Sequence, residues 1–566
     1  MHNSIRLLLV FGWLLVDSSA AFSRAESARV TPVTAAVASA HPLATRAGYE
    51  ILQQGGNAFD AAVAISAALA VVEPYASGIG GGGLWLLHRA RDGFETMIDA
   101  RETAPGKITQ AMFLDDDGKP KPSLSLDGGL AAAIPGLPAG LAHLAKKYGK
   151  LPLKTSLAPA IRYARDGFHV DQRYRQMTET RLEMLQTAIP AAKLFLDGGA
   201  VPDEKFSLRQ PNLAATLETL GKKGVDSFYQ GPLARQLVAG ANAAGGVWQM
   251  ADLKSYRVIE RKPVTFTFQG ATITSAALPS SGGLTLAQSL NILEYTPYAT
   301  ADSKTRTHYI AEAMRRAFHD RARYLGDPDF TKPPVDKLLD KNYAARRALS
   351  IDPNAATPSA GLEQAEVKSS EGTSTTHFSV IDRAGNRVAA TLSINQPFGS
   401  GVVAGNTGVL LNNTMDDFAL SPGVPNAYGL VGSEANSVKP GKRPLSSMSP
   451  TFVEDERGIL ILGTPGGSRI ISMVLLGILN YMAKAEVDVQ KIVAAPRFHH
   501  QYLPDRIEAE PEEFDPELIA QLSGLGHKVD IAKRRWGNMQ AVFFDKKTRQ
   551  TQTGNDPRGI GGLAWY

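Results

Sequence analysis

Residues 371–380 read Glu-Gly-Thr-Ser-Thr-Thr-His-Phe-Ser-Val and join a polar linker to a patterned strand. We interpret Thr375 as the catalytic residue. A threonine hydroxyl is a poor nucleophile until a base takes its proton, and cutting the chain just before Thr375 would free an α-amine that can serve as that base. Threonine also favours strands for purely structural reasons, so the sequence around this stretch has to decide between the two interpretations.

The chain changes character at this point. Residues 351–374 contain scattered Pro, Ala, Ser, Glu and Gln without an apolar period, which is the composition of a mobile linker. Residues 377–380 then alternate polar and apolar side chains, 384–385 predicts a turn, and 388–394 predicts an antiparallel return strand. A loose approach followed by an ordered strand suits chain cleavage between Ser374 and Thr375.

Four sequence blocks surround or follow this boundary. They are Thr375-Thr376-His377, Leu411-Asn412-Asn413-Thr414-Met415-Asp416-Asp417-Phe418, Arg443-Pro444-Leu445-Ser446-Ser447-Met448-Ser449-Pro450, and Gly463-Thr464-Pro465-Gly466-Gly467-Ser468-Arg469. In order and spacing these blocks resemble the γ-glutamyltranspeptidase family of N-terminal nucleophile hydrolases. Similar stretches run from about Ser39 to the C-terminus, so the resemblance covers nearly the whole chain.

Helical patterns interleaved with antiparallel strands predict two packed sheets covered by helices on both faces. The resemblance sharpens this α+β prediction to the four-layer αββα sandwich of N-terminal nucleophile hydrolases. It implies a large subunit at 21–374, after a signal peptide at 1–20 that is argued below, and a small catalytic subunit at 375–566. The two subunits would be cut from one precursor and would form a single αββα unit.

Composition narrows the class of protein. The 566 residues, for which length alone suggests three or four domains, are 43% hydrophobic and 20% charged, as in ordinary globular proteins. Sixty Lys and Arg face 55 Asp and Glu without a dense basic run, so we expect no nucleic-acid partner. The chain has no cysteine, which excludes thiol catalysis and thiolate metal sites.

The N-terminus has the pattern of a secretory signal peptide. Arg6 precedes an apolar run from Leu7 to Val16, and the small residues of 18–21 follow it. We predict cleavage after Ala20, with Ala21 or Ala25 as alternatives. A membrane span needs about 20 apolar residues, and this run is too short. Together with the absence of cysteine, the pattern predicts a periplasmic or secreted bacterial protein without a membrane span.

One glycine cluster imitates a nucleotide-binding motif. Residues 78–83 satisfy G-x-G-x-x-G, but a dinucleotide site needs this loop after a strand and before a helix. Here the loop follows a helix predicted at 58–72 and precedes a strand predicted at 84–87, so we reject a nucleotide cofactor.

His499-His500 lacks the partners and spacing of a zinc site, and we expect neither a metal nor a cofactor. Between 131 and 354 the pattern predicts helices joined by short loops.

The resemblance implies a mechanism centred on Thr375. Its Oγ would attack the γ-carbonyl of a γ-glutamyl amide such as glutathione, while its α-amine accepts the proton. The acyl group would then pass to water, an amino acid or a peptide. The backbone N–H groups of Gly466 and Gly467 would stabilise the oxyanion. Ser393 stands where the family usually has a threonine that supports the nucleophile, and it keeps the hydroxyl.

Recognition of a glutamyl group needs opposite charges for its two ends. The resemblance assigns the α-amino group to Asp417, and it assigns the α-carboxylate to Arg101 together with Ser446 and Ser447. An arginine suits a carboxylate because its planar guanidinium donates two hydrogen bonds side by side. Asn395 can serve either end.

Two further positions follow from the resemblance. Residues 421–436 match a lid loop found in part of the family, and Tyr428 would be its gating residue; an ordinary surface loop is the alternative. Thr414 occupies a position where the family usually has a glutamine or glutamate that helps to bind the amino group. Threonine is too short for that contact.

Two other functions remain open from the sequence. One is a glutaryl-type acylase acting on acylated β-lactams or similar amides, because that activity occurs on the same scaffold. The other is a periplasmic solute-binding protein. A denaturing gel separates the last from the first two, since a binding protein stays one chain and the hydrolase runs as two.

Overall fold

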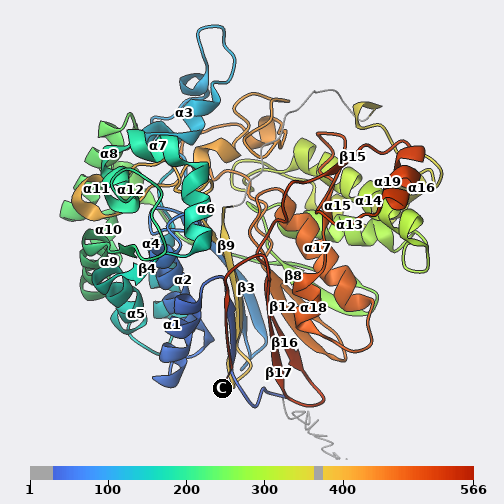
Figure 1. Ribbon diagram of the computed structural model, residues 1–566, viewed down its shortest axis with the longest axis horizontal. Coiled ribbons are helices and arrows are strands. Elements are labelled where there is room, and N and C mark those ends of the chain that lie inside the picture. The colour runs from blue at the N-terminus through green and yellow to red at the C-terminus, as the bar shows by residue number, and fades with distance from the viewer. Residues whose placement is uncertain (1–29, 362–373, 566) are drawn as a thin grey trace, which may run out of the picture.

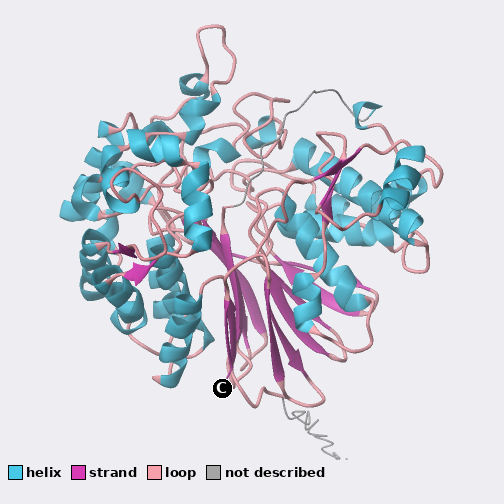
Figure 2. Ribbon diagram, in the orientation of Figure 1, coloured by secondary structure: helices cyan, strands magenta, loops and turns pink. Residues whose placement is uncertain are grey.

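Two antiparallel sheets form the centre of the molecule, and the computed structural model describes residues 30–361 and 374–565. The larger sheet has the order β18 (Gly562–Trp565), β1 (Ala36–Ser39), β9 (Thr376–Ile381), β10 (Arg387–Ser393), β2 (Gly82–Arg89), β3 (Phe94–Ala100), β6 (Ile259–Arg261). The smaller has the order β17 (Thr551–Asn555), β16 (Gln540–Asp545), β12 (Gly458–Gly463), β11 (Thr451–Glu454), β8 (Ala271–Ser275), β7 (Val264–Phe268). Figures 1 and 2 show the two sheets standing side by side.

The space between the sheets is filled by apolar side chains that range in size from alanine to phenylalanine. Ala36, Leu86 and Ala389 of the larger sheet face Phe452, Ile461 and Val542 of the smaller one in a single buried cluster. Since strand side chains alternate between faces, the opposite face of each sheet is free to bury a second set of side chains against helices.

Helices cover both outer faces (Figure 2). Those whose buried side chains join the core of the larger sheet are α1 (Pro42–Gln53), α2 (Ala58–Val72), α4 (Leu137–Lys147), α5 (Leu153–Asp166), α6 (Gln172–Thr180), α7 (Leu182–Thr187), α8 (Ile189–Phe195), α9 (Pro211–Lys223), α10 (Asp226–Tyr229), α11 (Gly231–Ala243) and α12 (Met250–Ser255). Those of the smaller sheet are α13 (Gly282–Leu293), α14 (Ser303–Tyr324), α15 (Val335–Leu339), α16 (Lys341–Leu349), α17 (Arg469–Met482), α18 (Val489–Ala494) and α19 (Pro516–Gly524). The predicted four-layer αββα arrangement of class α+β is therefore confirmed.

The remaining elements are small. They are α3 (Pro122–Leu126), the pair β4 (Phe168–His169) and β5 (Ser207–Leu208), and a three-stranded sheet of β13 (Phe498–His499), β14 (Ile507–Ala509) and β15 (Val529–Ile531). Short 3-10 helices lie at Gln110–Phe113, Gly129–Ala131, Ser359–Gly361, Gly405–Thr407, Thr414–Asp417 and Glu434–Asn436.

Local sequence signals explain the best-predicted helix. The side chain of Asn57 accepts hydrogen bonds from the backbone N–H groups of Phe59 and Asp60, and the Asp60 carboxylate accepts one from the N–H of Asn57. This reciprocal cap starts α2 where the sequence predicted it. Every residue of α2 is buried, because its many alanines let α1 and α5 approach closely.

β9 is buried on both faces, because one face meets helices and the other meets the second sheet. The structure differs from the sequence prediction at 131–354: β4 to β8 lie within this range, where the pattern predicted helices joined by short loops. The predicted signal peptide and residues 362–373 of the predicted linker lie outside the described residues.

Strands from both sides of the Ser374–Thr375 boundary share each sheet. β9 and β10 pair with β1 and β2 in the larger sheet, and β11 pairs with β8 in the smaller. Among the described helices, none combines the length and apolar character needed to cross a membrane.

Candidate active site

Strand pairing brings two hydroxyl groups together at one end of the larger sheet. β9 begins at Thr376 and β10 ends at Ser393, and the antiparallel register pairs Thr376 with Leu392. Thr375 therefore lies beside Ser393, and their Oγ atoms are 3.0 Å apart. The N–H of Asn395 donates to the Ser393 Oγ at 2.8 Å, which fixes that hydroxyl.

The backbone at Thr375 is strained. Its φ is +117°, in a region that side chains other than glycine rarely occupy. The chain is continuous from Ser374 to Thr375, so the nitrogen of Thr375 is an amide in this structure. The Ser374 hydroxyl donates to the backbone oxygen of Asn395 at 2.6 Å and holds the residue before the strained bond.

Nearly all the candidate site residues line one pocket. Nine of the ten do so: Arg101, Thr375, Ser393, Asn395, Asp417, Tyr428, Ser446, Ser447 and Gly467. The tenth, Gly466, directly precedes Gly467 in the chain and is not part of the lining. The unfilled space has a volume of about 40 Å³, which holds only a few water molecules.

Arg101 and Asp417 form an ion pair inside this pocket. The Nη2 of Arg101 donates to an Asp417 carboxylate oxygen, and its Nε donates to the backbone oxygen of Pro444 at 3.3 Å. Arg101 is only 2% exposed, so the pair is shielded from water. Burial raises the pKa of Asp417, and the neighbouring Arg101 guanidinium opposes that rise.

Thr414 does not line the pocket. Its hydroxyl donates to Oε1 of Glu102 at 2.9 Å, and the other oxygen of Glu102 lies 3.5 Å from Nη1 of Arg101. Both Thr414 and Glu102 are fully buried. The short side chain at position 414 thus supports Glu102 behind Arg101 and leaves the pocket wall to Asp417.

A second acidic residue faces the opposite way from Asp417. The carboxylate of Asp416 accepts a hydrogen bond from the Ser125 hydroxyl at 2.9 Å and one from the N–H of Ala427 at 3.0 Å. Burial, together with the charge of Asp417, raises the pKa of Asp416 to about 7. Asp416 therefore attaches the lid loop 421–436 to the wall of the pocket.

Tyr428 closes the pocket from this loop. Its hydroxyl donates to the backbone oxygen of Asn395 at 2.8 Å. Its ring lies against Gly467, where a Cβ would come within 2.4 Å of the tyrosine ring carbons. Gly467 also has a φ of +58°, so both the space and the backbone conformation require glycine there.

One residue of the pocket, Arg321 of α14, was not predicted from the sequence. Its side chain is 4% exposed, its Nε donates to the Ser281 hydroxyl at 2.9 Å, and its Nη2 donates to the Ser447 hydroxyl at 3.1 Å. Burial lowers its pKa to about 10. Arg321 is one of several arginines in α14, and nothing in the local sequence distinguishes it from the others.

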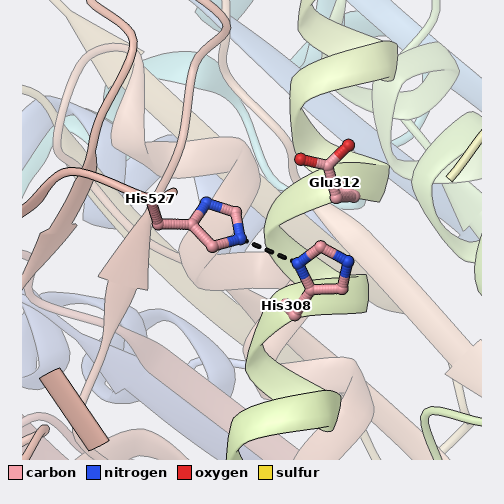
Figure 3. Close-up of side chains that lie close together, drawn as sticks. All are labelled: His308, Glu312 and His527. Carbon is pink, nitrogen blue, oxygen red and sulfur yellow. Dashed lines mark hydrogen bonds between the residues drawn. The ribbon is translucent and has the colours of Figure 1, made fainter. Parts of the chain in front are cut away.

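A buried cluster away from the pocket has a possible metal-ligand composition. His308 and His527 point toward each other and Glu312 lies close by, with ligand atoms of the three within 4.8 Å of one another (Figure 3). However, both oxygens of Glu312 already accept hydrogen bonds from Arg315 and Arg316. A cation there would face two guanidinium groups, so the donor set fits a metal ion poorly.

The two histidines of this cluster instead form a neutral pair. The Nε2 of His308 faces the backbone oxygen of Asp352 at 2.9 Å and must donate to it. Its Nδ1 therefore accepts from the Nε2 of His527 at 2.8 Å. The sequence pair His499-His500 is also bonded to protein groups, since His499 contacts Ser472 and Gln501, and His500 accepts from the N–H of Tyr502.

Comparison with known proteins agrees with the arrangement. The family model described as gamma-glutamyltranspeptidase matches residues 44–566. The chain is 42% identical over 534 residues to the glutathione hydrolase proenzyme of Escherichia coli, covering 93% of this chain and 91% of that one. It is 38% identical to the acylase ACY 1 proenzyme of a Pseudomonas species, covering 89% of each.

A solved structure has the same fold. The cephalosporin acylase of Bacillus halodurans superposes with a TM-score of 0.81 at 28% identity, over 97% of this chain and 99% of that one. The family model spans most of the chain, and the blocks that carry the resemblance line one pocket. The chain therefore belongs to the γ-glutamyltranspeptidase family.

Proposed function

We propose that this protein is a γ-glutamyl transferase and hydrolase that cleaves γ-glutamyl amides such as glutathione through a γ-glutamyl-enzyme on Thr375. The observation that carries the proposal is the pocket in which the paired hydroxyls of Thr375 and Ser393 adjoin an Arg101–Asp417 ion pair. The hydroxyls supply a nucleophile and its support, and the ion pair offers one charge for each end of a zwitterion. The name of the Escherichia coli relative, glutathione hydrolase, points to the same donor class.

The nucleophile first has to be released from the chain. The Oγ of Thr375 attacks the carbonyl carbon of Ser374, the C–N bond breaks as the nitrogen takes a proton, and an ester joins the two residues. Water then hydrolyses the ester. This leaves a carboxylate on Ser374 and a free α-amine on Thr375, and it divides the chain into 21–374 and 375–566. The strained φ of Thr375 supports the proposal because cleavage relieves it.

In turnover the new amine acts as the base. It takes the proton of the Thr375 hydroxyl as Oγ attacks the γ-carbonyl of the donor, and it returns that proton to the leaving amine. Water, an amino acid or a peptide then accepts the glutamyl group. Ser393 holds the attacking hydroxyl in place from 3.0 Å. The N–H groups of Gly466 and Gly467 are the proposed oxyanion donors, a contribution typically worth about 100- to 1,000-fold in rate.

Recognition of the donor is proposed to be an exchange of ion pairs. Without substrate, Arg101 and Asp417 satisfy each other. A γ-glutamyl group brings an α-carboxylate for Arg101, supported by Ser446 and Ser447, and an α-ammonium for Asp417 with help from Asn395. Both buried charges keep a partner, as their burial requires. A glutaryl group supplies only the carboxylate. Asp417 then loses its ion pair with Arg101 and gains no ammonium group in its place.

Substrate access is proposed to need movement of the lid loop 421–436. The free space of about 40 Å³ is too small for a glutamyl group. The bond between the Tyr428 hydroxyl and the Asn395 backbone closes the pocket, and the link from Asp416 to Ala427 holds the same loop. Closure over bound donor would then exclude bulk water from the acyl-enzyme.

We further propose that the protein is exported to the periplasm or secreted. The support is the basic and apolar N-terminal pattern of Arg6 and residues 7–16 followed by small residues. N-terminal sequencing of protein recovered from the periplasm tests this, with Ala21 the expected first residue.

The donor class is tested with two anilides that differ only in the α-amino group. We expect kcat/KM for the γ-glutamyl anilide to exceed that for the glutaryl anilide at least about tenfold, because an unpaired buried charge costs about 1 to 3 kcal/mol or more. The preference should widen in Thr414→Gln, whose longer amide can reach the amino group. Equal rates would favour the second candidate function, a glutaryl-type acylase, for which the likeness to the cephalosporin acylase is the supporting observation.

Chain processing is tested separately on a denaturing gel. Wild-type protein should run as two fragments, Thr375→Ala as one, and Thr375→Ser as two after slower cutting. Thr375 should be the first residue of the small fragment, and any other residue there would overturn its assignment as the nucleophile. A wild-type protein that remains one chain would fit a solute-binding protein.

A further inference from the structure

Arg321 is a buried cation in the pocket that the proposed mechanism does not use. It projects from α14 and lines the pocket together with Thr375 and Asp417. Arg101 is compensated by the carboxylates of Glu102 and Asp417. Arg321, in contrast, forms no ion pair with any carboxylate in the described part of the chain, and Asp417 acts on it only at longer range.

A buried guanidinium without a counter-ion is costly, and an anion entering the pocket removes that cost. The anionic end of the proposed donor is its α-carboxylate. Arg321 reaches the region assigned to that carboxylate through Ser447, whose Oγ accepts its Nη2 at 3.1 Å. Both the positive charge of Arg321 and its position next to Ser447 therefore fit the α-carboxylate of the donor.

The hydrogen bonds around Arg321 also fix how Ser447 is oriented. Because the Ser447 Oγ accepts from a cation, its own hydrogen points elsewhere and is polarised for donation. Ser281 holds the other side of the guanidinium: its Oγ accepts from Nε and donates to the backbone oxygen of Ser446 at 2.7 Å. One arginine thus fixes both serines proposed to contact the carboxylate.

We propose that Arg321 is a positioning residue for the α-carboxylate of the donor, acting through the hydroxyl of Ser447. The inference rests on the proposed γ-glutamyl activity and adds a second positive charge to its carboxylate subsite. It predicts a specific change in the selectivity among donors. Loss of Arg321 should weaken donors that carry the α-carboxylate and should leave donors without it almost unaffected.

The experiment uses processed enzyme and three anilides: γ-glutamyl, 4-aminobutanoyl, which lacks only the α-carboxylate, and glutaryl, which lacks only the α-amino group. Arg321→Met should lower kcat/KM about 10- to 100-fold for the γ-glutamyl and glutaryl anilides, mainly through KM. The value for the 4-aminobutanoyl anilide should change less than about threefold. Arg323→Met, an exposed position on the same helix, is the matched control and should match wild type on all three.

Two further variants separate charge from shape. Arg321→Gln keeps a hydrogen-bond donor without the charge, and Arg321→Lys keeps the charge with fewer donors. If the charge acts through Ser447, kcat/KM for the γ-glutamyl anilide should fall most in Arg321→Met, less in Arg321→Gln and least in Arg321→Lys. Arg321→Gln also replaces Arg321→Met should the latter not fold, with chain cutting on a gel as the check.

The outcomes are distinct. Equal loss on the 4-aminobutanoyl and γ-glutamyl anilides would show a merely structural role and overturn the inference, as would unchanged kinetics in every processed variant. Failure of the proposed function looks different, because wild-type enzyme would then show no γ-glutamyl activity or no preference over the glutaryl anilide.

Discussion

Arg101 and Arg321 enter the same pocket, but their partners give them different roles. Arg101 donates to Asp417 and to the backbone oxygen of Pro444, so its guanidinium is held by several fixed acceptors. A planar guanidinium can keep the contact with Pro444 and, once Asp417 turns to the ammonium of the donor, present a side-by-side pair of N–H groups to the carboxylate. A lysine ammonium offers one point of charge and cannot do both.

Arg101→Lys should therefore damage donor binding even though the charge is conserved. A charge-assisted hydrogen bond is worth about 1.5 to 3 kcal/mol, so kcat/KM for a γ-glutamyl anilide should fall roughly 10- to 100-fold. Chain cutting should survive, because the polar partners of Arg101 are Pro444, Glu102 and Asp417, and neither Thr375 nor Ser393 is hydrogen-bonded to it. The matched control is Arg91→Lys, whose side chain is 76% exposed. Unchanged kinetics in a fully processed Arg101→Lys would remove Arg101 from the site.

At the residue scale the sequence predicted which side chains meet in the pocket, but not the packing and hydrogen bonds that hold them there. Thr375 and Asp417 could be found because each lies in a block that resembles the family, and Ser393 because the wider resemblance aligns it with a threonine of the family. Arg321 could not, since a charged residue in an amphipathic helix is usually solvated and its burial depends on how α14 packs. Thr414 was recognised as a departure, but its bond to Glu102 is visible only in three dimensions.

The elements position the site through close backbone approaches. The glycine cluster at 78–83, which imitates a nucleotide loop, follows α2, includes the first two residues of β2 and packs against the end of β10. A Cβ at Gly81 would lie 2.2 Å from the backbone oxygen of Ser393 and 2.7 Å from Cγ2 of Ile394. Gly81 therefore lets the chain pack closely against Ser393, beside Thr375.

Gly81→Ala should push Ser393 away from Thr375. Overpacking of this kind typically costs about 1 to 3 kcal/mol, and we expect a matching loss of stability together with slower chain cutting. Thermal unfolding and a time course on denaturing gels measure the two effects. Gly524→Ala is the control, because nothing lies within 4 Å of a Cβ there. If both variants cut at the wild-type rate, the Gly81 contact does not position Ser393.

Near Tyr428 the lid loop is attached by three hydrogen bonds: from the Tyr428 hydroxyl to Asn395, from Gln501 to the Tyr428 backbone oxygen, and from the N–H of Ala427 to Asp416. Loss of one of them should loosen the loop. Tyr428→Phe removes the donor to the Asn395 backbone and leaves the ring against Gly467. A neutral hydrogen bond contributes about 0.5 to 1.5 kcal/mol, so proteolysis within 421–436 should become about 2- to 10-fold faster. Tyr295→Phe, at a half-exposed position, should leave the rate unchanged. Equal rates for the two variants would show that this bond does not hold the loop closed.

The elements themselves were predicted unevenly, for identifiable reasons. α2 has a strong cap and clear ends, and it forms where expected. β7 and β8 were missed, although Val264–Phe268 alternates and Gln269–Gly270 makes a tight turn with positive φ at both residues. Their helical surroundings in the sequence obscured this hairpin, and only the pairing of β8 with β11 places it in the sheet.

At the scale of the whole molecule, a cut at Ser374–Thr375 leaves two interleaved fragments. Strands of both share each sheet. The end of the earlier fragment is also tied to the later one, since Ala356 donates to the backbone oxygen of Leu525 at 2.6 Å and Ser359 donates to the Asp505 carboxylate at 2.7 Å. The fragments should therefore unfold together and not dissociate first.

The His308–His527 pair lies at this junction and gives the stability a pH dependence. Burial, aided by His308 and Arg315, lowers the pKa of His527 to about 3, against a value of 6.5 in the unfolded chain. Below pH 6.5, His527 therefore binds a proton in the unfolded state but not in the folded state. The stabilisation is complete above pH 6.5 and is lost progressively as the pH falls toward 3. Asp416 and Glu513, whose pKa values burial raises to about 7, act in the opposite sense over part of this range.

A variant isolates the histidine from these opposing groups. The side-chain amide of Gln in His527→Gln can still donate to Nδ1 of His308 but cannot titrate. At pH 7.5 its free energy of unfolding should equal that of wild type or lie slightly below it. At pH 5 wild type should have lost about 2 kcal/mol at this site, which is 1.5 pH units at about 1.36 kcal/mol each, so the variant should gain that amount relative to wild type. Urea unfolding of the processed protein at both pH values measures the difference, and the carboxylates cancel because both proteins contain them. A difference that is the same at pH 7.5 and pH 5 would mean that His527 titrates normally in the folded protein, and the buried neutral pair would then be wrong.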